Sequence, residues 1–203
     1  LLVFKNRHRS IREMFNANIA KWASREFLVL GDRRITYEEL KSCVESTAYS
    51  MQTQCGIKQG DRVAILGANS PEWVISFFAA THLGAIVSAL NGWWTETEIR
   101  HALELTDPSL VVGDSRRLAR AGSLLDNFQV IDFDQNPLFF ENSGNEPEYP
   151  DLNEDDPALI LFTSGTTGKS KGALLSHRSL VGFVDGTIPV SYTHLRAHET
   201  VLD

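Results

Sequence analysis

A stretch rich in glycine, hydroxyl and lysine residues offers the clearest chemistry in this sequence. Residues 163–172 read Thr-Ser-Gly-Thr-Thr-Gly-Lys-Ser-Lys-Gly and follow an apolar run at residues 158–162. The glycines allow backbone N–H groups to turn toward one anion, while the hydroxyl groups and the two lysines add donors and positive charge. The pattern therefore predicts a strand followed by a phosphate-binding loop, with a nucleoside triphosphate as the ligand.

A Walker A loop is the first alternative for this stretch. Gly168, Lys169 and Ser170 match the last three positions of G-x-x-x-x-G-K-[ST], but Thr163 stands where the first glycine belongs. The residues that follow, 173–176, read as a short strand, whereas a Walker loop opens directly into a helix. A Walker-type ATPase or kinase would also need an acidic strand end, for which Asp132 is the candidate, and that residue precedes the loop. A plain solvent loop would explain the composition but not the ordered Lys-Gly ending.

Residues 162–172 resemble the signature of the adenylate-forming superfamily, which contains acyl-CoA synthetases, luciferases and peptide-synthetase adenylation domains. The signature has the form [YF]-T-S-G-[ST]-T-G-x-P-K-G, and this sequence departs from it at Ser170, where proline is usual. Serine does not preset φ as proline does, so the departure loosens the end of the loop without removing a phosphate ligand. Residues 35–40 also resemble the superfamily segment L-[TS]-Y-x-E-L, and residues 83–95 are most similar to acyl-CoA synthetases.

The resemblance implies which residues hold ATP. Lys171 is expected to pair with the phosphates as the catalytic residue, and Thr163 is expected to approach Mg²⁺. The full set of expected nucleotide-binding residues is Thr163, Ser164, Gly165, Thr166, Thr167, Gly168, Lys171 and Gly172.

The resemblance also implies a reaction in two halves. A carboxylic acid, expected to be a fatty acid, attacks ATP to give an acyl-adenylate and pyrophosphate, and the thiol of CoA then displaces AMP. The superfamily's downstream adenine, ribose and lid-domain segments have no counterpart before Asp203, so the resemblance implies a fragment that is inactive alone. A non-enzymatic nucleotide-binding module and a peptide-synthetase adenylation domain remain alternatives.

Composition narrows the class of protein. The chain has 203 residues, of which 42% are hydrophobic and 22% charged, as in ordinary soluble globular proteins. Its formal charge of −7 argues against nucleic acid as the main partner. No apolar run approaches the roughly 20 residues that span a bilayer. We therefore expect a cytoplasmic protein without a transmembrane segment, in which Cys43 and Cys55 are free thiols.

Strands that alternate with helices predict the elements that position the loop. We expect an α/β fold with a doubly wound, mainly parallel sheet flanked by helices. Four helices carry start signals: Ser10 with Glu13, Thr36 with Glu39, Ser70 with Pro71, and Thr95 with Glu98. Helices are expected at 10–22, 36–54, from 71, 95–105, 115–125 and 178–185, strands at 60–66, 84–90, 109–112, 128–131, 158–162 and 173–176, and a hairpin at 27–36.

The domain organisation follows from two stretches of unusual composition. Residues 132–156 hold nine acidic residues and no basic ones, which predicts a linker or long surface loop rather than a metal site. Residues 191–203 resemble a translated sequencing-adaptor read-through and are expected to be non-native, although His194 and His198 have the spacing of a metal pair on a helix. Residues 1–190 are then expected to form part of an N-terminal AMP-binding domain.

For three further side chains, the sequence allows both a structural and a functional role. His177 precedes an expected helix, and we expect it to fix the start of that helix rather than to act as a catalytic base. Trp93 and Trp94 follow a strand, and we expect them to pack as a lid at its end, with acyl-chain contact as the alternative.

Overall fold

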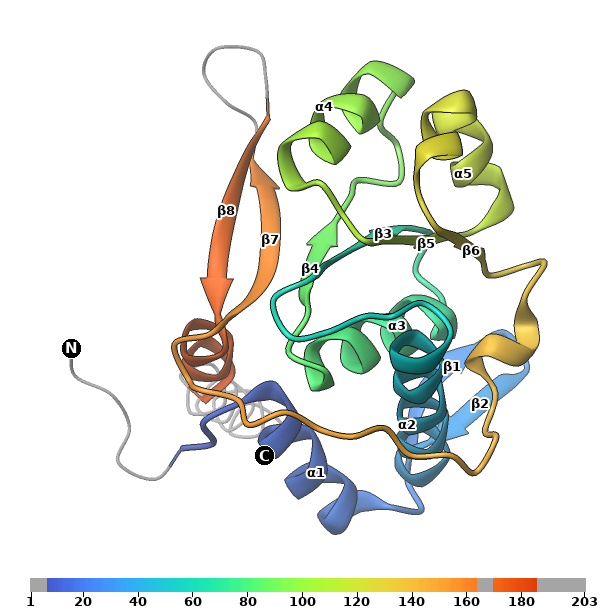
Figure 1. Ribbon diagram of the computed structural model, residues 1–203. Helices are drawn as coiled ribbons and strands as arrows, with labels where there is room; N and C mark the ends of the chain where they lie inside the picture. Colours follow the sequence, from blue (N-terminus) through green and yellow to red (C-terminus); the bar gives the residue numbers. More distant parts are fainter. Residues whose placement is uncertain (1–6, 164–169, 186–203) are drawn as a thin grey trace, which may run out of the picture.

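The fold is built on a six-stranded sheet between two layers of helices (Figure 1). The computed structural model describes residues 7–163 and 170–185. The strand order is β6-β5-β3-β4-β7-β8, and all neighbours are parallel except β7 and β8. This arrangement confirms the predicted doubly wound, mainly parallel sheet. Its strands are β3 (Arg62–Leu66), β4 (Ile86–Ala89), β5 (Leu110–Gly113), β6 (Val130–Asp132), β7 (Pro157–Thr163) and β8 (Lys171–Ser176).

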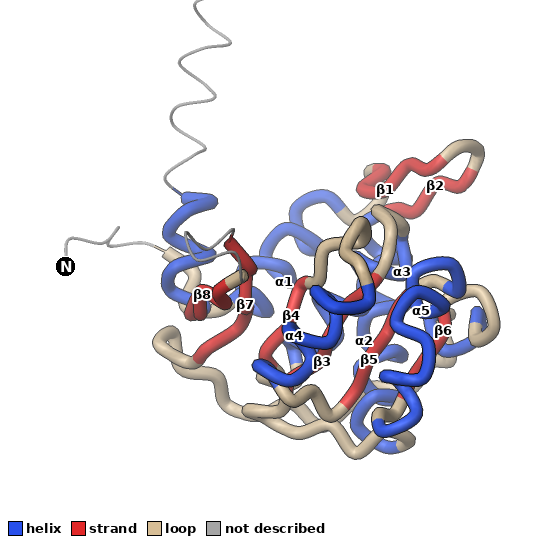
Figure 2. The backbone as a smooth tube through the Cα atoms, turned by 90° about the horizontal axis from the view of Figure 1, so that it is seen from above, coloured by secondary structure: helices blue, strands red, loops and turns tan. Residues whose placement is uncertain are grey.

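The helices divide between the two faces of the sheet (Figures 1 and 2). One face is covered by α2 (Tyr37–Thr53) and α3 (Pro71–His82), against which α1 (Ile11–Trp22) packs, and the other by α4 (Glu96–Thr106) and α5 (Ser115–Ala121). Residues 177–185, which follow β8, are also helical.

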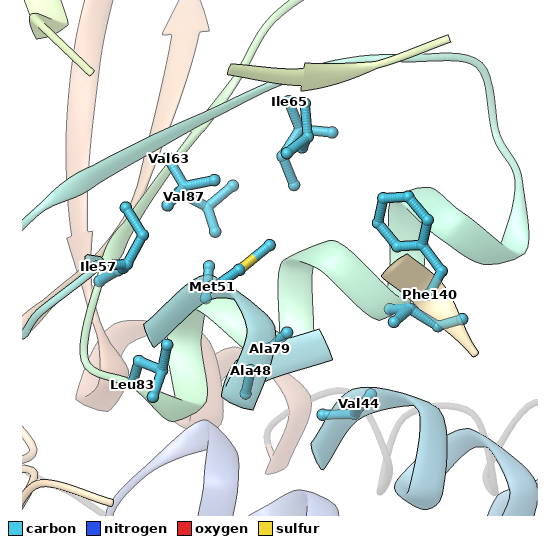
Figure 3. Close-up of a cluster of buried hydrophobic side chains, with 14 of the residues drawn as sticks. Val44, Ala48, Met51, Ile57, Val63, Ile65, Ala79, Leu83, Val87 and Phe140 are labelled. Carbon is cyan, nitrogen blue, oxygen red and sulfur yellow. The ribbon is translucent and has the colours of Figure 1, made fainter. Parts of the chain in front are cut away.

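Alternate residues of each central strand enter two separate cores. Val63 and Ile65 of β3 belong to the core beneath α2 and α3 (Figure 3), whereas Ala64 and Leu66 belong to the core beneath α4 and α5. Successive side chains of a strand point to opposite faces, so a parallel strand covered on both sides is apolar throughout. That burial explains why β3 reads as a continuous apolar run.

The predicted start signals lie at the starts of the helices. Thr36 and Glu39 form a complete capping box at α2, and Ser70 caps α3 with Pro71 as the first helical residue. At α4, the Glu98 carboxylate accepts hydrogen bonds from the backbone and the hydroxyl of Thr95. Such bonds satisfy N–H groups that have no partner inside the helix.

Two helix ends differ from the prediction. At α1, the hydroxyl of Ser10 accepts from Glu13 N–H, but the Glu13 carboxylate accepts from Arg9 N–H instead of from Ser10. The helix expected at 115–125 stops at Ala121 and continues as a 3-10 turn, Gly122–Asn127. Gly122 has a φ of 51°, which ends the α-helical path because α-helical residues have negative φ.

The predicted hairpin is confirmed as a separate two-stranded sheet. It consists of β1 (Glu26–Leu30) and β2 (Arg33–Thr36), which pair in antiparallel fashion. Gly31 occupies the turn with a φ of 58°, a backbone conformation that glycine adopts without steric cost.

The acidic stretch at residues 132–156 is anchored to the core at more than one place, and Phe133 near its start is buried there. A short 3-10 turn, Pro137–Phe140, buries Phe139 and Phe140 against the core beneath α2. The Thr47 hydroxyl of α2 donates to the carbonyl of Phe139. Most of the stretch is otherwise exposed, as its acidic composition requires.

Two further expectations concern the whole chain. Cys43 and Cys55 are free thiols, as predicted, and burial raises the pKa of Cys55 to about 11. Among the helices of residues 7–163 and 170–185, none has the length and apolar character needed to cross a bilayer.

Candidate functional site

The predicted phosphate-binding stretch occupies the end of the β7–β8 hairpin. Thr163, the last residue of β7, pairs with Lys171, the first residue of β8. Ser164, Gly165, Thr166, Thr167 and Gly168 lie outside the described residues, so their predicted contacts with phosphate stay predictions. Of the expected nucleotide-binding residues, the structure thus places Thr163, Lys171 and Gly172.

Thr163 and Lys171 lie at the edge of the sheet where ligands of such folds bind. β7 runs parallel to β4, so Thr163 lies at the same edge as the carboxyl ends of the central strands. Open α/β sheets bind ligands outside the carboxyl ends of their strands. Both residues are exposed, and within the described part of the chain no hydrogen bond or ion pair engages the Lys171 ammonium. The ammonium is therefore available to an anionic ligand.

The end of the loop contacts α4, which lies beside the hairpin in Figure 1. The Nε2 atom of His101 lies 2.9 Å from the carbonyl oxygen of Ser170. A carbonyl oxygen accepts hydrogen bonds and cannot donate them, so Nε2 carries the proton and donates. Sequence reasoning missed His101, because no local pattern links a residue of α4 to a loop 69 positions later.

The opposite strand of the hairpin contacts the residues just before α4. The ring of Trp94 meets the ring of Phe162 edge-on, with 5.1 Å between centroids and 80° between planes. The guanidinium of Arg120 donates to the carbonyl of Gly92 at 2.7 Å, which fixes the turn that carries Trp94. The expected packing role therefore holds for Trp94, whereas Trp93 is 78% exposed and does not pack as a lid.

Gly172 permits close contact between the two hairpin strands. A Cβ atom at this position would lie 2.9 Å from Cγ2 of Ile160 and 3.8 Å from Cδ2 of Leu105 in α4. Real Cβ atoms essentially never approach another heavy atom below 3.0 Å. The glycine is thus explained by packing, independently of any ligand.

His177 has a structural role at the other end of β8. Its Nδ1 atom accepts a hydrogen bond of 3.2 Å from the backbone N–H of Ile11, the first residue of α1. The ring is buried, and desolvation lowers its pKa, so the imidazole is neutral. Because His177 follows Ser176 while Lys171 begins the strand, the structure does not bring this histidine to the phosphate end of the hairpin.

A magnesium site is not assembled by the described residues alone. Among residues 7–163 and 170–185, no group of three or more His, Cys, Asp or Glu side chains is placed to hold a metal ion. Thr163 offers one hydroxyl oxygen, and Mg²⁺ in nucleotide sites takes several of its ligands from water and substrate phosphates. The residue fits such a site as one ligand among several.

The Walker alternative is contradicted by the element that follows the loop. Residues Lys171–Ser176 form a strand, not the helix that a Walker loop requires. Asp132, the candidate Walker B residue, ends β6 at the far edge of the sheet, with β5, β3 and β4 between it and β7. Its carboxylate accepts a hydrogen bond from the hydroxyl of Ser115.

Comparison with known proteins finds a family and several relatives. The sequence pattern of the family described as AMP-binding enzyme matches residues 15–202. 4-Coumarate–CoA ligase 1 of Petroselinum crispum is 28% identical over 207 residues, covering 95% of this chain and 38% of the relative. Indoleacetate–CoA ligase of Aromatoleum aromaticum is 34% identical over 160 residues, covering 73% of this chain and 31% of the relative.

A similar solved structure is that of the N-terminal subdomain of Klebsiella oxytoca NpsA. It has a TM-score of 0.73 and 30% identity, and the match covers 86% of this chain and 43% of that one. The same protein has been solved as an artificially fused adenylation–PCP di-domain NRPS, with a TM-score of 0.73 and 29% identity over 86% of this chain and 34% of that one. The chain spans about a third of the length of the two curated relatives.

The comparisons leave the terminal segment undecided. The family match extends to residue 202 and therefore includes most of residues 191–203. These residues lie outside the described part of the structure, so their expected non-native origin stays a prediction.

Proposed function

The chain belongs to the AMP-binding enzyme family, and from that membership we propose that it supplies the phosphate-binding hairpin of an enzyme that activates a carboxylic acid with ATP. The observation that carries the proposal is the pairing of Thr163 with Lys171 at the ligand-binding edge of the sheet. The pairing places a hydroxyl group and an ammonium group on adjacent strands, on either side of the Gly- and Thr-rich loop. A triphosphate offers acceptors to both groups.

In the proposed reaction, the carboxylate of the substrate attacks the α-phosphorus of ATP, and the bond to pyrophosphate breaks. Negative charge develops on the leaving pyrophosphate, where the Lys171 ammonium stabilises it. A fixed positive group lowers the barrier because it needs no reorganisation as the charge forms. The acyl-adenylate then reacts with the thiol of CoA, and AMP leaves.

Mg²⁺ is proposed as the metal of this site. When bound, it would neutralise part of the charge on the phosphates and draw them into one orientation. Thr163 is the described residue that would contribute a ligand, and its exposure leaves the hydroxyl accessible.

We propose a carboxylic acid as the class of substrate. Two relatives act, according to their names, on 4-coumarate and on indoleacetate, both of which are aromatic carboxylic acids. These relatives support activation of a carboxylic acid with transfer to CoA. The fatty acid expected from the sequence stays a prediction, to be compared with the aromatic acids in one assay.

A second candidate function differs in the acceptor thiol. The likeness to NpsA, solved in fusion with a PCP domain, favours a peptide-synthetase adenylation domain as the alternative. Such a domain would perform the same adenylation but would pass the acyl group to a carrier protein rather than to CoA. The adenylation half-reaction therefore tests both candidates, and the transfer step separates them.

The decisive experiment is acid-dependent exchange between ATP and labelled pyrophosphate. The protein should be expressed from the longest reading frame that contains this chain, and tested with 4-coumarate, indoleacetate and palmitate in parallel. Exchange that requires one of the acids supports the proposal, and consumption of CoA thiol in a second assay assigns the acceptor. ATP binding without exchange for any carboxylic acid would instead favour a non-enzymatic nucleotide-binding module.

A further inference from the structure

We propose that His101 is a positioning residue that holds the backbone next to Lys171 in place for ATP, an inference that rests on the proposed function of the hairpin. The contact that carries it is the hydrogen bond from His101 Nε2 to the carbonyl oxygen of Ser170, at 2.9 Å. His101 contributes no group of its own to the phosphates. Its effect on the reaction passes through the peptide that joins Ser170 to Lys171.

The geometry of a peptide unit explains how one bond at Ser170 orients Lys171. The carbonyl of Ser170 and the N–H of Lys171 belong to the same planar group, which rotates as one body. A hydrogen bond to the carbonyl therefore fixes the direction in which β8 starts. The position of the Lys171 Cα atom, and with it the origin of the ammonium side chain, is fixed at the same time.

Ser170 is a position at which such support matters. Proline would lock φ near −65°, and serine leaves that rotation free. A free rotation must be frozen when the lysine engages a phosphate, and the lost entropy weakens binding. The bond from His101 restricts the backbone before the ligand arrives, and so replaces part of the rigidity that a proline would give.

The donor, His101, belongs to α4, a helix that is packed on the core. Glu98 caps the start of α4, and Ile99, Ala102 and Leu103 are buried beneath it. His101 is half-buried on this helix, and its backbone is held by the buried residues on either side of it. The anchor is therefore fixed by the core and not by the ligand.

The α4 unit, by which we mean α4 together with Trp94 just before it, also contacts the other strand of the hairpin. Trp94, just before α4, packs edge-on against Phe162, the residue before Thr163. Thr163 and Lys171 thus each adjoin a residue that the α4 unit contacts. The α4 unit therefore contacts β7 and the residue just before β8. Such contacts would set the separation of these two strands at the end where phosphate is proposed to bind.

The first test is kinetic and uses the enzyme with acid-dependent exchange activity. We expect His101→Ala to lower kcat/KM for ATP by roughly two- to tenfold, the range of one hydrogen bond, while KM for the carboxylic acid is unchanged. His101→Gln, which retains an N–H donor, is expected to recover part of the loss. Thr97→Ala is the matched control, because Thr97 is an exposed neutral residue one turn earlier on α4.

A double variant tests the specific link to Ser170. Ser170→Pro restricts φ directly, so we expect the loss caused by His101→Ala to shrink in the Ser170→Pro background. An equal loss in both backgrounds would overturn the inference. The inference would also fail if His101→Ala matched Thr97→Ala, or if it lowered the melting temperature and raised both KM values together, as a merely structural residue would.

The second test needs no catalysis and keeps the inference separate from the proposed function. Hydrogen exchange of the protein expressed from the longest reading frame that contains this chain is measured on a peptide that covers residues 170–174. We expect faster exchange in His101→Ala than in the wild type or in Thr97→Ala, and equal rates would overturn the inference. A wild type without acid-dependent pyrophosphate exchange would refute the proposed function, while faster hydrogen exchange in His101→Ala would still support the anchor.

Discussion

In the proposed reaction, the ammonium of Lys171 stabilises the negative charge on the leaving pyrophosphate. Because its ammonium is exposed and has no hydrogen bond or ion pair among the described residues, its removal would cost little folding free energy. We expect Lys171→Ala to slow acid-dependent pyrophosphate exchange by roughly ten- to two-hundredfold, the range of a charge-assisted hydrogen bond. Lys58→Ala removes an exposed lysine elsewhere and is expected to leave the rate unchanged. Equal rates in the two variants would show that Lys171 does not contact the phosphates during reaction.

Two buried histidines make the stability of the fold depend on pH. Desolvation lowers the pKa of His82 to about 3 and also lowers the pKa of His177. His82 is surrounded by the rings of Phe15, Phe78 and Tyr149 and by the positive charges of Arg12 and Lys41, with His177 also nearby. The backbone of Phe78 favours the protonated ring, but desolvation by burial is the larger effect. This apolar and positively charged setting disfavours a proton on the imidazole.

The sign of the pH effect follows from where the protons bind. Below about pH 6.5 the unfolded chain takes up a proton at His82, while the folded chain does not until about pH 3, so stability falls as pH falls. The lowered pKa of His177 acts in the same direction. For His82 alone we expect a loss of roughly 2 kcal/mol in the free energy of unfolding between pH 7 and pH 5. Urea denaturation at both pH values measures it. In His82→Phe this loss should shrink, whereas His8→Ala should keep it; a full loss in His82→Phe would rule out His82 as the source.

At the scale of elements, the helix starts were predictable because each depends on neighbouring residues. Thr36 and Glu39 lie one turn apart, and their reciprocal bonds at α2 require nothing from the rest of the fold. The start of α1 is different. Its first N–H, at Ile11, donates to His177, and Glu13 bonds to Arg9. The local cap by Ser10 is present, but the N–H of Ile11 is satisfied by a partner 166 residues away, and local spacing carries no sign of it.

Two glycines, Gly172 in the β7–β8 hairpin and Gly182 in the helix that follows it, allow a stability test with opposite signs. Gly172→Ala would place a Cβ atom 2.9 Å from the branched side chain of Ile160, and overpacking of this kind costs about 1–3 kcal/mol. Gly182→Ala is the matched control, because Gly182 lies in the helix at 177–185 with nothing within 4 Å of its Cβ position. Alanine at that site should stabilise the helix by roughly 0.5–1 kcal/mol. Thermal denaturation that moved both variants in the same direction would contradict this description of the hairpin.

At the scale of the whole molecule, the place of the predicted loop in the fold was predictable but its supports were not. The apolar run before Thr163 predicts a strand that ends at the loop, and the structure confirms that strand and places Thr163 at its carboxyl end. Phosphate binding at this end stays a prediction. The contacts from His101 and Trp94 depend on β7 lying next to β4. β7 follows β6 in the sequence but lies next to β4, because the chain crosses from one edge of the sheet toward the other between them. The sequence of α4 does not indicate this arrangement.

The same strand order leaves β8 at the edge of the sheet, with consequences for the chain in solution. Leu174 is 60% exposed on β8, Leu161 is 41% exposed on β7, and Phe183 is 75% exposed in the following helix. An edge strand with exposed apolar side chains favours pairing with another chain. We therefore expect the 203-residue chain, expressed alone, to self-associate and to be poorly soluble.

Light scattering after size-exclusion chromatography provides the measurement of this association. Leu174→Lys places a charge on the edge strand and should shift the chain toward the monomer, since natural sheets use lysine to block such edges. Leu138→Lys is the matched control, because Leu138 is 78% exposed but lies in the 3-10 turn after β6, at the other edge of the sheet. If both variants reduce association equally, general surface polarity is responsible rather than the edge of β8. A wild-type chain that is already monodisperse and unfolds cooperatively would show that this edge is not a site of association at all.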